Sequence, residues 1–173
     1  MSRVIALVER LAPDSIALLE RAARQRIADA EDLNRNGRRL PAIYFLGFAV
    51  EMLLAAAYFR SVGFGITKPI DRQTRSSRMV FARKQIAWDG EPLMSGDPHP
   101  LVGWARLLEW NVLKSGECSA PLRNRLSEAI RIAESVYRHW RPELRYKNPD
   151  ASEEQYAEVL RAADWFLLVS KEL

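Results

Sequence analysis

The sequence predicts an all-α fold, an antiparallel up-and-down bundle of four to five helices. Apolar residues recur at three- and four-residue steps in several segments, and one segment of about twenty residues is apolar on every side. No alternating strand pattern of useful length occurs. The chain has 173 residues, 48% of them hydrophobic and 28% charged, which is the size and composition of one globular domain over residues 1–173.

The first long helix is expected from residue 14 to residue 35. Asp14 or Ser15 can cap its start, and an Asn-Gly pair after it supplies a left-handed stop. Glu20 and Arg24 are expected to form an i,i+4 ion pair on the outer face. The apolar stripe that defines the inner face comprises Ile16, Leu19, Ala23, Ile27, Ala30 and Leu33.

The second helix, from Pro41 to about Phe59, is apolar all round except at Glu51, as expected for a helix surrounded by others. Gly47 in its interior costs about 1 kcal/mol relative to alanine, and close approach of a neighbouring helix is the expected reason. The stretch is long enough to cross a bilayer. However, Glu51 would then lie near mid-membrane at a cost of roughly 2.5–3.5 kcal/mol, and arginines flank both ends. We expect a buried core helix and no membrane partner.

The stretch from residue 61 to residue 98 is the least readable, because glycines and prolines interrupt any long element. Residues 77–88 are compatible with a short helix or an extended segment. The rest predicts three further helices. The third runs from about Pro98 to Leu113, the fourth follows a cap at Ser119, and the last follows Ser152, where Gln155 has the spacing of a capping box.

Charge and cysteine content restrict the class of protein only loosely. The formal net charge of +4 does not by itself require a nucleic-acid partner. Cys118 is the only cysteine, so an internal disulfide is impossible and a reducing compartment is expected. The first residues contain no apolar run long enough for a signal peptide. We therefore expect a cytoplasmic protein.

Four motifs occur in order along the chain: Gly37-Arg38 after the first helix, Tyr44–Gly47–Glu51 in the apolar helix, Asp97–His99–Leu101 before the third, and Pro142-Glu143-Leu144-Arg145-Tyr146 before the last. In this order they resemble the HEPN (higher eukaryotes and prokaryotes nucleotide-binding) family of helical domains. The resemblance implies a bundle that forms homodimers. It also implies association with RNA, a nucleotide or a nucleotidyltransferase-type protein in a bacterial defence or toxin–antitoxin context.

The sequence departs from the ribonuclease signature of that family, in which four to six residues separate an arginine from the histidine that follows it. Arg131 precedes His139 with seven residues between them. Eight helical positions correspond to about 80° of rotation and 12 Å of rise, so these side chains would not converge well. No catalytic residue is therefore assigned. An atypical metal-independent ribonuclease using His139 with Arg131 or Arg138 is one alternative function, and a purely structural protein-interaction domain is another.

Two basic clusters are the candidate nucleic-acid-binding sites. One follows the fourth long helix, and the other lies between the second and third long helices, where a mobile basic loop could grip a phosphate backbone. The candidate residues are Arg138, His139, Arg141, Arg145 and Lys147 in the first cluster, and Arg72, Arg75 and Arg78 in the second. Trp140, beside the first cluster, continues an apolar stripe and is expected in the core rather than as a stacking platform.

Glu51 is the candidate buried polar residue. A carboxylate in an apolar helix needs a partner, and the expected one is an arginine or tyrosine on a neighbouring helix. Two histidines and one cysteine show no metal-ligand spacing, so neither a metal nor a cofactor is expected. His99, between two prolines, is expected to cap or pack at the start of the third long helix.

Overall fold

The structure, a computed structural model, describes residues 14–87, 90–96, 99–116, 118–146 and 151–173, without the side chains of Arg145 and Tyr146. It confirms the predicted all-α bundle. The helices in the described residues are α1 (Ile16–Arg35), α2 (Arg39–Ser61), α3 (Arg72–Lys84), α4 (Leu101–Lys114), α5 (Ala120–His139), the 3-10 helix η2 (Pro142–Tyr146) and α6 (Glu153–Val169). No strand occurs in these ranges apart from two isolated bridges.

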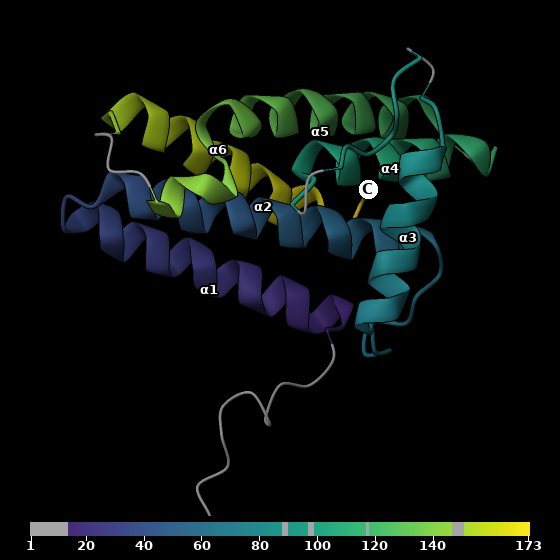
Figure 1. The fold of residues 1–173 in the computed structure, drawn as a ribbon, viewed down its shortest axis with the longest axis horizontal. Helices are drawn as coiled ribbons and strands as arrows, with labels where there is room; N and C mark the ends of the chain where they lie inside the picture. The colour runs from purple at the N-terminus through teal and green to yellow at the C-terminus, as the bar shows by residue number, and fades with distance from the viewer. Residues whose placement is uncertain (1–13, 88–89, 97–98, 117, 147–150) are drawn as a thin grey trace, which may run out of the picture.

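Helix α2 is the centre of the bundle. Figure 1 shows it between α1 on one side and α4, α5 and α6 on the other, and it contacts α1, α4 and α6. By length and composition it is the one described helix that could cross a membrane, but 67% of its most apolar window is buried within the fold. This degree of burial is typical of the core helix of a bundle.

The predicted helix starts at three serines are confirmed. The hydroxyl groups of Ser15, Ser119 and Ser152 accept hydrogen bonds from backbone N–H groups of the first turns of α1, α5 and α6. Gln155 completes the capping box by accepting from the Ser152 N–H at 2.9 Å. These caps are local, because each satisfies otherwise unpaired N–H groups within three residues of itself.

Gly47 allows close packing against α2, as expected, but the group that packs there is a side chain rather than a neighbouring helix. The indole of Trp140, the residue after α5, lies directly on Gly47 and is fully buried. Its Nε1–H donates to the carbonyl oxygen of Tyr44 at 3.0 Å. The expected core position of Trp140 is therefore confirmed, and it links the end of α5 to the middle of α2.

Two expectations about surface segments are wrong. The expected Glu20–Arg24 pair forms at 3.9 Å, but Glu20 is buried rather than on the outer face, because Arg60 of α2 reaches its carboxylate at 2.5 Å and also donates to the Ser170 carbonyl at 3.0 Å. The basic stretch after α2 is not a loop throughout, because Arg72–Lys84 forms α3. Helix α3 runs across one end of the bundle (Figure 1), and Ala82 is its only buried residue.

Candidate nucleic-acid interface

The Glu51 carboxylate is a meeting point of three segments. Glu51 is 3% exposed in the middle of α2, and Arg75 of α3 lies 3.1 Å from its Oε1. The Nδ1 of His99, just before α4, lies 3.0 Å from its Oε2. Because a buried carboxylate is costly without partners, these contacts tie α3 and the start of α4 to the central helix.

Both partners of Glu51 are engaged further by the core. Arg75 lies 3.7 Å from the Asp14 carboxylate, and its guanidinium lies 5.7 Å from the centre of the Trp104 ring. The His99 ring packs edge-on against Phe48, with 5.2 Å between ring centres. These contacts give the Glu51 centre a structural role in holding α3 in place.

Arg78 also faces inward from α3. It hydrogen-bonds the Tyr58 hydroxyl, where burial raises the pKa of Tyr58 and the neighbouring guanidinium opposes that rise. Two of the three candidate arginines of the connection, Arg75 and Arg78, are therefore anchors of α3. Arg72 is exposed at the first position of the helix.

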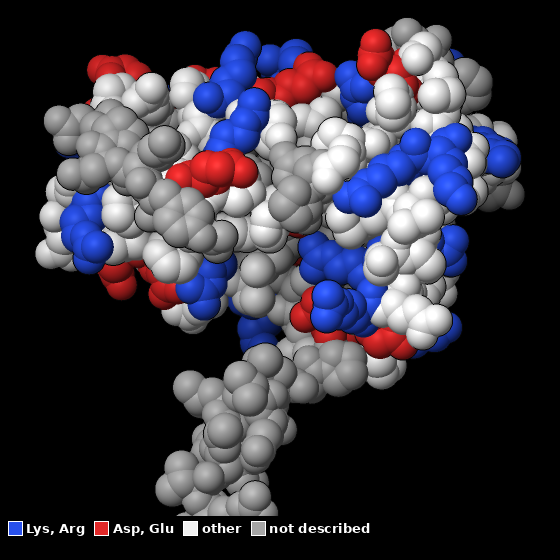
Figure 2. Space-filling model, in the orientation of Figure 1, with Lys and Arg blue, Asp and Glu red and all other residues white. Residues whose placement is uncertain are grey.

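Helix α3 is basic, and Arg72, Arg83 and Lys84 lie exposed on it. The helix carries five basic residues and no acid, whereas the net charge of the whole chain is only +4, so the excess positive charge is concentrated here. Arg72, Arg75 and Arg83 line one shallow hollow of about 330 Å³, together with Ser76. Within the described residues, neither Arg72 nor Lys84 has an acidic partner. Figure 2 shows Lys and Arg side chains gathered over and beside α3.

Exposed apolar side chains border these cations. Val80 and Phe81 on α3 are 45% and 38% exposed, and Ile86 just beyond the helix is 58% exposed. The Phe81 ring lies 5.6 Å from the Trp110 ring of α4, and the Lys114 ammonium sits 4.5 Å from the centre of Trp110. The α3 surface, defined here as Arg72, Ser76, Phe81, Arg83 and Lys84, thus combines cations, a hydroxyl and an aromatic face.

The second basic cluster is engaged with its own surroundings. Arg138 and His139 share the Glu158 carboxylate of α6, at 3.6 and 3.0 Å, and Arg141 covers the Tyr137 ring at 3.3 Å from its centre. The Ser135 hydroxyl and then His139 and Arg138 hold the pKa of Glu158 below its usual value.

Of the remaining candidates, the backbone of Arg145 lies in η2, its side chain is not described, and Lys147 lies outside the described residues.

The two clusters do not form one surface. Trp140, next to His139, lies on Gly47, whereas Arg78 meets Tyr58 eleven positions later on α2. Eleven helical residues span about 16 Å. Arg131, considered with His139 for catalysis, pairs with Glu128 at 2.5 Å instead.

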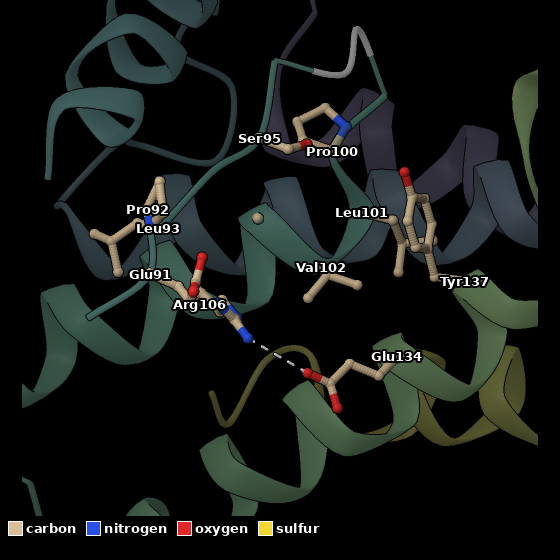
Figure 3. A pocket seen from close by; sticks show the side chains of 11 residues that line it. Glu91, Pro92, Leu93, Ser95, Pro100, Leu101, Val102, Arg106, Glu134 and Tyr137 are labelled. Atoms are coloured by element: carbon tan, nitrogen blue, oxygen red, sulfur yellow. Dashed lines mark ion pairs between the residues drawn. The ribbon is translucent and has the colours of Figure 1, made fainter. Parts of the chain in front are cut away.

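A hollow between α4 and α5 has no counterpart in the sequence analysis. It has a volume of about 460 Å³, and its walls come from residues 91–95, the start of α4 and one face of α5. Figure 3 shows the Arg106–Glu134 ion pair, 3.6 Å long, reaching across the gap between the two helices. No local pattern signals this site, because Arg106 and Glu134 meet only through the packing of the helices.

Comparison of the chain with models of known protein families, with characterised proteins and with solved structures finds no match. The resemblance to the HEPN family therefore stays a prediction.

Proposed function

We propose that this protein is a non-catalytic helical module that binds single-stranded nucleic acid, RNA in particular, through the α3 surface. The observation that carries the proposal is one hollow lined by Arg72, Arg83 and the Glu51-bound Arg75, on a helix that has five basic residues and no acid. Cationic grooves that follow a phosphate backbone provide most of the affinity for nucleic acid.

The shape of the α3 surface suits a strand of a few nucleotides. Arg72 and Arg83 are eleven residues apart on the helix, a separation of about 16 Å along its axis. The Ser76 hydroxyl lies between them as a hydrogen-bond donor to phosphate oxygens. Phe81 lies about 180° around α3 from Arg72, next to Lys84, and its partly exposed ring offers an unpaired base a stacking contact worth about 1–3 kcal/mol. Bases in a duplex are already stacked, so a single strand is the preferred ligand.

The wider setting of this proposal comes from the sequence. The resemblance to the HEPN family, together with the helical bundle, supports a HEPN-like domain that forms homodimers. The same resemblance supports a cytoplasmic role in bacterial defence or in a toxin–antitoxin pair, with a nucleotidyltransferase-type protein as the partner. Size-exclusion chromatography with light scattering tests the dimer, and co-purification with such a partner tests the pairing.

Fluorescence anisotropy with a labelled oligouridine and with an RNA duplex tests the nucleic-acid proposal. Affinity for a single strand falls with a slope of about −0.7 per phosphate contacted, so three contacts predict about 20-fold weaker binding between 50 and 200 mM salt. The double variant Arg72→Glu with Lys84→Glu should weaken binding and reduce the salt slope by about 1.4, which is 0.7 for each lost contact. It removes no inward-facing contact of α3, so the fold should be retained.

Arg131→Glu with Arg138→Glu on α5 is the matched control, because it makes the same change in charge at side chains that are 71% and 73% exposed. This control should bind RNA nearly as well as the unmodified protein. Equal losses in the two double variants, salt-independent binding or no binding at all would each contradict a site on α3.

A further inference from the structure

The hollow between α4 and α5 is formed by well-packed walls. Leu93 and Met94 are each 2% exposed, and Met94 lies so close to Gly103 that a Cβ there would be 2.8 Å from its Cγ. The segment carrying them is held by backbone hydrogen bonds from Leu93 to Gln85 at 3.1 Å and from Ala87 to residue 91 at 2.7 Å. The volume of about 460 Å³ lies in the usual range for small-molecule sites.

A second hollow of about 280 Å³ continues the first along α4 and α5. Leu93, Arg106 and Glu134 line both hollows, and Trp110 lines the second. The Arg106–Glu134 pair is therefore a bridge across one groove, with apolar wall on both sides of it. The α4–α5 groove denotes these two hollows together.

Acidic residues outnumber basic residues among those that line the groove. Its lining contains three carboxylates, those of Glu91, Glu109 and Glu134, and one guanidinium, that of Arg106. The whole chain has a net charge of +4. Glu134 is half exposed, and its ion pair at 3.6 Å is longer than a direct hydrogen bond. An incoming cation can therefore approach this carboxylate without breaking a short contact.

We propose that the α4–α5 groove binds a small organic cation, an amine with an apolar body. The apolar body lies against Leu93, Leu101 and Val102, and the ammonium group lies beside the Glu134 carboxylate. Tyr137 lines the first hollow and Trp110 the second, with Arg141, just beyond α5, at 3.3 Å from the centre of the Tyr137 ring and Lys114 of α4 at 4.5 Å from that of Trp110. This site adjoins the α3 surface at the Phe81–Trp110 contact but shares no residue with it, and it does not depend on nucleic-acid binding.

Three probes with one apolar body and different charges test the proposal: phenylbutylamine, phenylbutanol and phenylbutyrate. A heteronuclear NMR titration that follows the indole N–H of Trp110, assigned with Trp110→Phe, measures each affinity. The amine should bind most tightly. Glu134→Gln should weaken amine binding about two- to fivefold, the range for a partly exposed charge pair, and should improve phenylbutyrate binding because the carboxylate beside Arg106 is removed.

Matched variants separate the site from general effects. Glu128→Gln changes the same charge on α5 outside the groove and should leave all three affinities unchanged. Val102→Phe fills the first hollow and should abolish binding of all three probes. If Val102→Phe disturbs folding, the affinities measured with Glu134→Gln still test the site.

Three results would overturn the proposal: no amine binding, binding that Glu134→Gln leaves unchanged, or tighter binding of phenylbutyrate that is lost in Arg106→Met. The double variant Arg72→Glu with Lys84→Glu should bind phenylbutylamine normally. A failure of this site can therefore be told apart from a failure of the nucleic-acid proposal.

Discussion

Replacing Gly47 with alanine tests the packing that joins α5 to the central helix. A Cβ at this position would lie within 3.0 Å of three atoms of the Trp140 indole, whereas ordinary contacts begin at 3.4 Å. The indole is rigid and fully buried, so it has no free rotation with which to withdraw. It must move as a unit, and its hydrogen bond to the Tyr44 carbonyl, 3.0 Å long, must lengthen or break.

The expected loss of stability follows from three contributions. Alanine gains about 1 kcal/mol over glycine in a helix interior. Overpacking a core costs about 1–3 kcal/mol, and leaving a buried polar group without its partner costs about 1–3 kcal/mol. Taking the middle of each range, Gly47→Ala should destabilise the protein by about 3 kcal/mol. For a chain of this size the melting temperature should then fall by about 6–12 °C.

Differential scanning calorimetry and urea denaturation measure this effect, and a double-mutant cycle with Trp140→Phe locates its cause. The smaller ring leaves room for the new methyl group, so the double variant should be more stable than the sum of the single effects predicts, by about 1–2 kcal/mol. An unchanged or higher melting temperature for Gly47→Ala, or strict additivity in the cycle, would refute the packing of Trp140 on Gly47.

Three further predictions concern individual polar residues. Ser152→Ala should lower the free energy of unfolding by about 1 kcal/mol in urea titrations, because it removes the cap of α6, whereas Ser152→Asp should retain it. Glu51→Leu should destabilise more than Arg75→Met, in circular-dichroism melts, because it leaves both a guanidinium and an imidazole at the core without their carboxylate. The folded-state pKa of Glu158 is depressed, so its contribution to stability is present above its usual pKa and is lost as pH falls through the lower value. The stability of Glu158→Gln, measured against pH, should lack this loss at low pH. The same dependence on pH in the variant and the unmodified protein would contradict the prediction.

Much of the fold could be predicted because its signals are local. Apolar periodicity defined the long helices, and Ser15, Ser119 and Ser152 marked their starts within one turn of sequence. Helix α3 was harder, because Ala82 is its only buried residue and no apolar stripe exists to be read. The one local signal was Asp71, whose carboxylate accepts from the Thr74 N–H at 2.6 Å as a helix cap. That hydrogen bond also holds the pKa of Asp71 low.

The candidate site was only partly predictable. Five basic residues between 72 and 84 were visible in the sequence, but which of them point inward depends on contacts with distant parts of the chain. Arg75 meets a carboxylate 24 positions away, and Arg78 meets Tyr58. The C-terminal cluster had the same composition, yet Glu158 of α6 pairs with two of its members.

The sequence by itself determined the helical class, the helix caps and the apolar character of α2, because these depend on residues within a few positions of one another. Tertiary structure decided the partners of charged groups. The local i,i+4 rule placed Glu20 on the surface, but Arg60, 40 positions later, buries it. Arg106 and Glu134 likewise meet only across the α4–α5 groove. Such pairs arise from the way the helices pack, and periodicity within one helix carries no information about the side chains of another.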